Sequence, residues 1–399
     1  MIRYLTAGES HGPEITGIVE GVPAGVPLTE EEIAEQLERR QKGYGRGGRM
    51  AFEKDRATIT GGVRFGKTIG SPISLRMPNR AYKKDDSNWP KVMAKGGDGD
   101  GVEPVTLARP GHADLTGVQK YGFDDIRPVI ERSSARETAM RVACCSIARL
   151  FLKQFGIEIG AHVLNIGSVG YESWDQVRKI TASLIQKGAE EVSHQADKSD
   201  VRCLDRSLGK AMREEIKKRR KEGSSLGGSY EIIVTGLPAG LGSYVHWDRK
   251  LDGEIARSIM STQAMKGVEI GLGFEAARRP GHQVHDEIMW EDDRYQRRTN
   301  RAGGLEGSVT TGMPLIIRGA MKPIPTMIKP LKTVDMVTKE EKDTRYERSD
   351  VCALPRAVVV AENVIAPVLA NAFLEKFGGD SLDEIKKRYD REVNRKESN

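Results

Sequence analysis

The sequence of 399 residues predicts an α+β fold, in one compact unit that spans residues 1–399. Three observations lead to this class. Strand-like and helix-like segments alternate too irregularly for a doubly wound parallel sheet. No low-complexity linker divides the chain, and no G-x-G-x-x-G stands between a strand and a helix, so a dinucleotide-binding fold is not expected.

In the first part of the chain, the spacing of apolar residues separates helices from strands. Thr29 and Glu32 have the spacing of a capping box, which marks the start of a helix. Gly156 ends a second, longer helical pattern. The expected elements are a helix over 29–41, strands over 57–62 and 71–77, a polar surface loop over 85–101, and a helix over 133–154.

The remainder of the chain continues the mixture of strands and helices. The pattern predicts strand material over 157–170, helices over 173–187 and 207–222, a strand over 230–235, a helix over 250–262, strands over 308–319, and helices over 356–376 and 382–396. The loops after residues 262 and 321 are rich in glycine or proline, so they can approach a ligand closely or stay stiff.

Composition limits the class of protein without choosing one function. The net charge of +6 attracts anions in general, including nucleic acid, membrane surfaces and phosphorylated metabolites. The N-terminus lacks the apolar core of a signal peptide, and no run approaches 18 apolar residues, so no membrane span is predicted. The four cysteines form no C-x-x-C pair, so no metal site is predicted, and reduced thiols fit a cytoplasmic protein.

Two histidines stand beside glycines in short polar motifs. In Gly8-Glu-Ser-His-Gly12, Ser10 and His11 follow an apolar strand-like start. In Arg109-Pro-Gly-His-Ala-Asp114, the Pro-Gly pair predicts a type II turn that would hold His112 rigidly. Histidine can exchange a proton near neutral pH, so each motif is a candidate acid site, although each also fits an ordinary structural turn.

Arginines accompany these motifs along the chain. Arg40, Arg46 and Arg49 are interleaved with glycines, a pattern that suits phosphate and carboxylate binding but also a solvated loop or a nucleic-acid tether. The run Arg132-Ser-Ser-Ala-Arg-Glu-Thr138 opens the expected helix over 133–154, where capping serines would favour an anion. Lys322-Pro-Ile-Pro-Thr326 predicts a stiff loop, and Arg348-Ser-Asp350 offers a cation beside a carboxylate base.

Taken together, these six segments resemble the chorismate synthase family. The motifs run from Gly8 to Arg356 in the expected order, so the resemblance covers nearly the whole chain. It implies helices sandwiched between two antiparallel β-sheets, assembled as a homotetramer. It also implies a lyase that removes phosphate from 5-enolpyruvylshikimate-3-phosphate by anti-1,4-elimination to give chorismate. Reduced FMN is required without net redox change, and NADPH is a possible reductant.

The resemblance also implies roles for individual residues. His11 is expected as the acid beside the departing phosphate, His112 as the group that protonates reduced flavin, and Asp350 as the carboxylate that helps to remove the ring proton. Substrate-binding positions are Ser10, Arg40, Arg46, Arg49, Arg109, Arg136 and Arg348. Flavin-binding positions are Arg132, Ser133, Ser134, Gln263, Ala264, Gly307, Lys322, Pro323, Ile324, Pro325, Thr326 and Arg348. Arg40 and Arg46 also match positions associated with NADP binding.

The chemistry of the substrate agrees with this set. It carries two carboxylates and a phosphate, roughly −3.5 to −4 in charge, so its burial requires several cationic partners. Two departures from the family pattern are mild: Gln263 stands where many members carry Asn, and Ser349 where many carry His. They affect the hydrogen bonds to flavin and remove no proposed catalytic group.

Two other classes of protein stay open. A nucleic-acid-binding protein is suggested by the pI near 9.0, the arginine–glycine loop and the basic run from Lys217 to Lys221. Aromatic residues make up only 6% of the chain, and a solvated helix face explains that run better. A flavin reductase would oxidise NADPH as its net reaction, which the lyase does not do.

Overall fold

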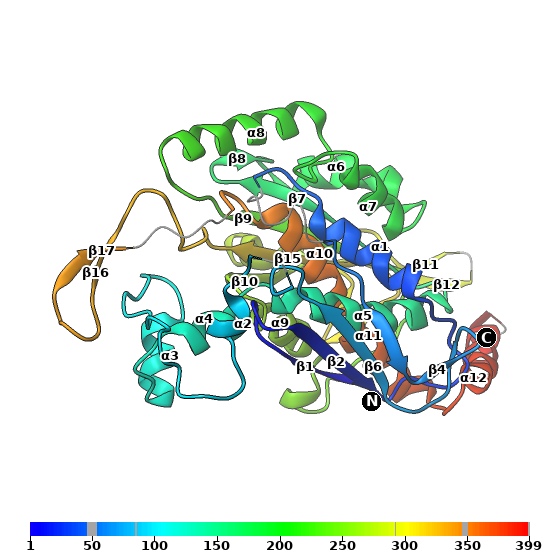
Figure 1. The fold of residues 1–399 in the computed structure, drawn as a ribbon. Coiled ribbons are helices and arrows are strands. Elements are labelled where there is room, and N and C mark those ends of the chain that lie inside the picture. Colours follow the sequence, from blue (N-terminus) through cyan, green and yellow to red (C-terminus); the bar gives the residue numbers. More distant parts are fainter. Residues whose placement is uncertain (46–53, 84–85, 292, 345–349, 398–399) are drawn as a thin grey trace.

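The computed structural model describes residues 1–45, 54–83, 86–291, 293–344 and 350–397. Within these ranges, the larger sheets are a four-stranded sheet in the order β1-β2-β6-β3 and a five-stranded sheet in the order β10-β15-β9-β7-β8. Every neighbouring pair in both sheets is antiparallel. Mixed helices and antiparallel sheets confirm the α+β class (Figure 1).

The four-stranded sheet turns one face toward the helical core. Its strands are β1 (Arg3–Ala7), β2 (Glu14–Glu20), β3 (Thr58–Gly61) and β6 (Ile73–Pro78). Side chains alternate along β2, where Ile15 and Val19 are buried and Ile18 is exposed. This alternation is typical of an antiparallel sheet with one covered face.

The five-stranded sheet is covered on both faces. Its strands are β7 (Glu158–Ile166), β8 (Val169–Gly170), β9 (Gly228–Thr235), β10 (Met265–Ile270) and β15 (Leu315–Met321). Residues 159–164 are all buried, as expected of a strand that is covered on both faces. Helices α6 (Trp174–Ile185), α7 (Ala189–Asp197) and α8 (Arg206–Lys221) lie on the side away from the other sheet (Figure 1).

Helix α5 (Glu137–Lys153) contacts strands of both sheets, β1, β2 and β6 on one side and β7 on the other. It also packs against α1 (Glu30–Gln41), α10 (Leu354–Val364) and α11 (Ala366–Phe377), and α10 contacts β7 and β9. Nearly every residue of α5 is buried, because partners surround it. The main hydrophobic core is therefore the space around α5 and α10.

The segment Leu354–Phe377 is long and apolar enough to cross a membrane by length and composition. It is instead the core pair α10 and α11, with 78% of its most apolar stretch buried inside the molecule. A buried core helix passes the same composition test, so this segment is weak support for a membrane span.

Several expected elements are confirmed, and others need correction. Thr29 caps α1, and the reciprocal capping box with Glu32 is present. The helix expected over 133–154 is confirmed as α5, but it begins at Glu137, and Ser133 is instead the last residue of a preceding helix, α4 (Arg127–Ser133). The loop expected over 85–101 contains a short helix, α2 (Trp89–Val92). Helix α7 was not predicted, because its nine residues carry only a short apolar pattern.

Further strands and α-helices lie outside the two larger sheets and the helices named above. They are β4 (Val63–Arg64), β5 (Lys67–Thr68), α3 (Asp114–Tyr121), α9 (Leu251–Met260), β11 (Ile288–Glu291), β12 (Arg294–Arg297), β13 (Leu305–Glu306), β14 (Val309–Thr310), β16 (Lys332–Val334), β17 (Glu341–Asp343) and α12 (Leu382–Glu397). The hairpin β16–β17 extends away from the body on the same side as α2, α3 and α4 (Figure 1). It is tied to residues 106–108 through a bridge between Leu107 and Asp335.

Close approach of α5 to the four-stranded sheet depends on Gly17. A Cβ atom at this position would lie 2.5 Å from Cys144 Sγ and 2.8 Å from Met140 Sδ. We predict that Gly17→Ala lowers the free energy of unfolding by about 1–3 kcal/mol, because the packed core must shift to admit a methyl group. Urea titration measures this change. Gly96→Ala, where nothing lies within 4 Å of the added atom, should change it by less than about 0.5 kcal/mol. Equal stability of Gly17→Ala and wild type would contradict the packing described here.

Candidate active site

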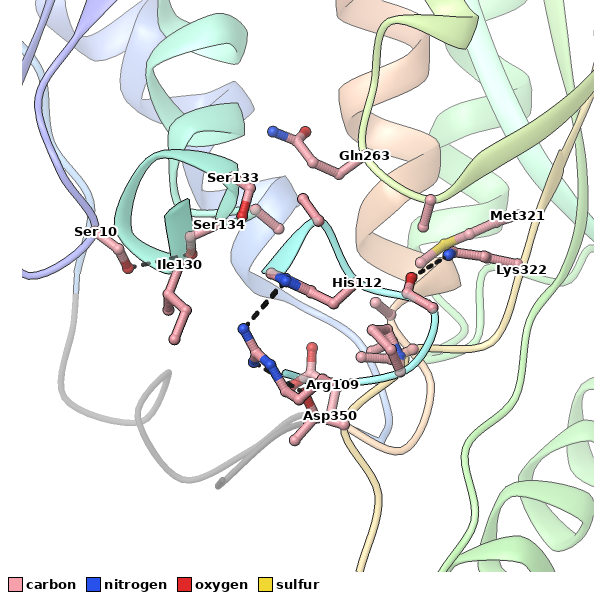
Figure 2. Close-up of a pocket in the computed structure, with 18 of the residues that line it drawn as sticks. Ser10, Arg109, His112, Ile130, Ser133, Ser134, Gln263, Met321, Lys322 and Asp350 are labelled. Atoms are coloured by element: carbon pink, nitrogen blue, oxygen red, sulfur yellow. Dashed lines mark hydrogen bonds between the residues drawn. The ribbon is translucent and has the colours of Figure 1, made fainter. Parts of the chain in front are cut away.

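A cavity of about 830 Å³ opens where loops from several parts of the chain meet. This volume suits a cofactor together with a small substrate. Figure 2 shows most of the side chains that surround it. The lining residues are Ser10, His11, Trp89, Arg109, Gly111, His112, Ala113, Arg127, Ile130, Ser133, Ser134, Ala135, Gln263, Ala264, Met321, Lys322, Ile324, Pro325, Thr326, Asp350, Ala353 and Arg356.

His11 lies in the turn that follows β1 and is held by a buried carboxylate. Its Nδ1 is 2.9 Å from Oε1 and 3.1 Å from Oε2 of Glu131 in α4. Its backbone N–H donates to Glu131 Oε2 at 2.7 Å. The imidazole also stacks on Trp89, with ring centroids 3.7 Å apart and 14° between the planes. The Asn79 side chain donates to the carbonyls of Glu9 and Gly12, which fixes the turn itself.

His112 lies in a second turn, which fits the expected type II geometry. Gly111 has a φ of 77°, and the His112 N–H donates to the Arg109 carbonyl at 3.2 Å. Asp114, buried at the start of α3, accepts from His112 Nδ1 at 2.6 Å and from Arg109 Nε at 2.8 Å. Arg109 Nη2 lies 3.2 Å from the same ring nitrogen (Figure 2). One carboxylate therefore organises both the guanidinium and the imidazole.

Both of these carboxylates stay ionised despite burial. Burial alone raises the pKa of Glu131, but hydrogen bonds from His11 and the charge of Arg127 hold that pKa below its ordinary value. Burial likewise acts to raise the pKa of Asp114, but hydrogen bonds from His112 and Arg109 outweigh it and place this pKa well below the usual range. An ionised carboxylate can only accept, so each histidine carries a proton on Nδ1.

The Lys322-Pro-Ile-Pro-Thr326 segment forms one wall of the cavity, immediately after β15. Lys322 Nζ donates to the Gly111 carbonyl at 2.5 Å, and Arg109 Nη1 donates to Thr326 Oγ1 at 3.3 Å. Ser225 donates to the Ile324 carbonyl at 2.5 Å. The stiff loop predicted here is thus tied to the turn that carries His112.

The Arg132–Thr138 run spans the break between α4 and α5, which corrects its expected position at the start of one helix. Ser133 ends α4 and donates to a carbonyl of its own helix, while Ser134 Oγ accepts weakly from the Arg136 N–H at 3.3 Å. The N-cap of α5 is Arg136, without a side-chain cap. Arg132 and Arg136 therefore do not share a helical face: the Arg132 side chain donates to carbonyls of the β1 strand end, whereas Arg136 is buried.

Gln263 and Ala264 lie between α9 and β10. Ala264 has a φ of 67°, an unusual value for a residue with a side chain. Gln263 Nε2 lies 3.3 Å from Glu137 Oε2, and Gln263 Oε1 is buried without a hydrogen-bond partner among the described residues. Gln263 lines the cavity, and a side-chain acceptor left without a partner is a candidate contact for a ligand N–H.

Asp350 reaches the cavity just before α10 and forms an ion pair with Arg356 in its first turn. Arg40 and Arg136 lie elsewhere: both are buried, both pair with the buried Asp55, and neither is among the lining residues. Two expected anion-binding arginines are thus engaged by one internal carboxylate.

The remaining predicted site residues fall into three groups: residues that do not line the cavity, residues outside the described part of the chain, and residues that line it. Arg132, Gly307 and Pro323 do not line the cavity in the described part of the chain. Arg46, Arg49 and Arg348 lie outside the described residues. The structure brings together Ser10, His11, Arg109, His112, Ser133, Ser134, Gln263, Ala264, Lys322, Ile324, Pro325, Thr326 and Asp350.

Sequence reasoning assigned no role to several residues that build this site. Asp114 and Arg356 lie within the matching segments and Glu131 directly precedes one, so their positions beside predicted site residues were a usable signal. Trp89 and Arg127 come from segments that carried no motif, and only the fold brings them to the cavity.

The fold and the cavity define an enzyme that acts on a small molecule. A model of the chorismate synthase family matches residues 2–374. The chain is 55% identical to the chorismate synthase of Salinibacter ruber over 393 residues, covering 97% of each protein. It is 53% identical to that of Geobacillus kaustophilus, covering 98% of each. A crystal structure of chorismate synthase matches with a TM-score of 0.79 at 41% identity, over 100% of this chain and 99% of the other.

The chain belongs to the chorismate synthase family. It is accordingly a lyase, which removes phosphate from 5-enolpyruvylshikimate-3-phosphate to form chorismate.

The Asp114 carboxylate should make the stability of the protein pH-dependent. Because its pKa is lowered in the folded state, the stabilisation is full above the ordinary carboxyl pKa and is lost as pH falls toward the lowered value. We predict that Asp114→Asn lowers the free energy of unfolding by about 1–3 kcal/mol at pH 7. The difference from wild type should shrink below roughly pH 4. Denaturant titrations from pH 3 to 8 measure it, with the exposed Asp124→Asn as control. A difference that stays constant over this range would refute the assignment.

Proposed function

We propose that the cavity binds the enolpyruvyl phosphate substrate beside a reduced flavin, and that phosphate and the ring proton leave there. The observation that supports this most strongly is the convergence of His11, His112 and Asp350 on one cavity. Both histidines carry an Nδ1 proton toward a buried carboxylate, so Nε2 is the ring nitrogen to which we assign proton exchange.

Cationic side chains bind the substrate's phosphate and two carboxylates. Arg109 and Ser10 both line the cavity, and Ser10 offers a hydroxyl there. Arg127, Lys322 and Arg356 add positive charge there. The proposed substrate-binding set is Ser10, Arg40, Arg46, Arg49, Arg109, Arg136 and Arg348, of which Arg40 and Arg136 are held through Asp55.

The elimination breaks the bond between ring carbon and phosphate oxygen, removes one ring proton, and forms a second ring double bond. His11 donates a proton from Nε2 to the departing phosphate, which would otherwise leave with an additional negative charge. Asp350 accepts the ring proton. His112, which lines the same cavity, would hold a proton on Nε2 for the cofactor. These roles require all three groups in one enclosed space, where exclusion of water strengthens their interactions.

The residues present fit a flavin. The buried Gln263 Oε1 atom has no hydrogen-bond partner in the part of the chain that the structure describes, and the stiff Lys322–Thr326 segment forms one wall of the cavity. When bound, a reduced flavin supplies an electron transiently as phosphate leaves and regains it, so no net redox change occurs. We assign its binding to Ser133, Ser134, Gln263, Ala264 and the Lys322–Thr326 segment, with Arg132, Gly307 and Arg348 as further positions from the family pattern.

The proposal also covers the cofactor, the reductant, the domain organisation, the assembly and the location of the protein. The cofactor is FMN, NADPH is a possible reductant, and Arg40 and Arg46 are its candidate contacts. The chain is one unit over residues 1–399, with helices sandwiched between its two larger sheets, a description supported by the contacts of α5 with both. We also propose a homotetramer that works in the cytoplasm, where four buried free thiols would stay reduced.

Replacing His11 or His112 by Ala should lower kcat by about 10²–10⁴-fold, because each variant loses a proton donor. FMN affinity should change little, since the flavin contacts lie mainly on other segments. Steady-state phosphate release and flavin fluorescence titration measure the two quantities. Wild-type turnover in either variant would remove that residue from the mechanism.

Asp350→Asn should slow turnover by at least about tenfold while KM stays similar, because the amide cannot accept the ring proton. A substrate deuterated at the reacting ring carbon supplies the measurement. The variant should show a larger isotope effect on kcat than wild type does. An unaltered rate and isotope effect would count against Asp350 as the base.

The decisive experiment is phosphate release from the enolpyruvyl substrate under anaerobic conditions, with and without dithionite-reduced FMN. Release that depends on reduced FMN without its net oxidation supports the proposal. Stoichiometric oxidation of NADPH without phosphate release would favour a flavin reductase. Salt-dependent binding of random DNA without turnover would favour a nucleic-acid-binding protein.

A further inference from the structure

Glu131 is not among the groups proposed to react, but the contacts of its side chain are almost entirely with one of them, His11. Glu131 is 2% exposed and lies in α4 behind His11. Both of its carboxylate oxygens are used by that residue: Oε1 faces Nδ1 at 2.9 Å, and Oε2 accepts the backbone N–H at 2.7 Å. Its own backbone carbonyl accepts from the Ser10 N–H at 3.2 Å.

Trp89 restrains the same imidazole from its face. The two rings stack 3.7 Å apart, so the ring plane of His11 is fixed as well as its proton. Arg127 links the two supports: its Nη1 lies 3.4 Å from Glu131 Oε1, and its guanidinium lies 5.5 Å from the centre of the Trp89 ring. Residues of α2 and α4 thus fix the tautomer, the ring plane and the position of the His11 imidazole.

We propose that Glu131 is a positioning residue for the reaction, which together with Trp89 fixes the His11 proton on Nδ1 and directs Nε2 into the cavity. This inference rests on the proposed acid role of His11. Glu131 does not line the cavity and need not touch substrate. It acts by keeping the acid in one tautomer and by balancing the positive charge of its imidazolium form.

The second histidine of the cavity shows the same arrangement independently. His112 Nδ1 faces the buried Asp114 at 2.6 Å, on a different turn and a different helix. A third pair lies elsewhere: His162 Nε2 is 3.3 Å from Glu231 Oε1, with both side chains wholly buried on the five-stranded sheet. That pair uses the other ring nitrogen and adds Arg178, as expected of a structural ion cluster. It offers a matched control with the same chemical groups away from the cavity.

A purely structural role for Glu131 predicts a different outcome from a positioning role. If Glu131 only fastened the turn at residues 9–12, its loss would weaken folding or binding whether or not His11 carries an imidazole. If it acts through the imidazole, its loss matters only while the imidazole is present. A double-mutant cycle between the two positions therefore separates the two roles.

The test uses the full-length enzyme with reduced FMN under anaerobic conditions and measures phosphate release for wild type, Glu131→Gln, His11→Ala and the double variant. We expect Glu131→Gln to lower kcat by roughly 10–100-fold, a part of what a positioned acid contributes, with KM within about threefold. In the His11→Ala background, the same change should alter kcat by less than about twofold. Glu231→Gln should leave kcat of the folded enzyme unchanged.

The outcomes are distinguishable from those that test the proposed function. Equal losses in both backgrounds would overturn the positioning role while leaving His11 as the acid. Wild-type turnover in His11→Ala would overturn the acid role itself, and this inference with it.

Trp89→Leu provides a second route if Glu131→Gln does not fold. It introduces no buried polar group and removes only the stacking ring. We expect a loss in kcat of roughly three- to tenfold, the range that corresponds to one stacked contact, and no further loss in the His11→Ala background. Unchanged turnover in Trp89→Leu would contradict the proposed role of Trp89 in holding His11. A loss in kcat that persists in the His11→Ala background would contradict it as well.

Discussion

The cavity depends on buried carboxylates that hold its basic groups in place. A site for a substrate with three anionic groups must gather positive charge, and those charges repel one another until the substrate arrives. At the cavity Asp114 holds Arg109 and His112, and Glu131 holds His11, whereas outside the cavity lining Asp55 holds Arg40 and Arg136. Each pairing offsets the cost of keeping a cation away from water and sets the direction in which its side chain points.

A packed helix joins these pairings to the rest of the fold. The run that carries Ser133, Ser134 and Arg136 is the junction of α4 and α5, and α5 is clamped between strands of both larger sheets. The turn that carries His11 leaves β1 of one sheet, whereas the Lys322–Thr326 segment leaves β15 of the other. Groups from opposite sides of the core meet because each lies at the end of an element with little freedom to move. A cavity of this construction can hold reacting groups within the tolerance that proton transfer demands.

Local sequence patterns predicted the features that depend on neighbouring residues. The capping box of α1, the Pro-Gly turn before His112 and the glycine stop after the long helix follow from preferences within a few positions. The same reasoning placed the start of the long helix four residues too early, at Ser133 instead of Glu137. Arg136, just before α5, pairs with Asp55 and Asn79, and these contacts involve residues more than 50 positions away that a local pattern does not include. Helix α2 was missed for a related reason: its Trp89 is stabilised by stacking on His11 rather than by its own segment.

The sequence by itself determined the α+β class, the family motifs and the identity of the histidines and arginines, because each of these is encoded by residue type and short-range order. Tertiary structure alone decided which basic groups line the cavity. It turned Arg40 and Arg136 toward Asp55, brought Arg127 and Arg356 to the wall, and placed Glu131 behind His11. The physical reason is that charge pairing in a buried site depends on distance in space, and residues such as His11 and Glu131, 120 positions apart in sequence, become neighbours only when the sheets close around their helices.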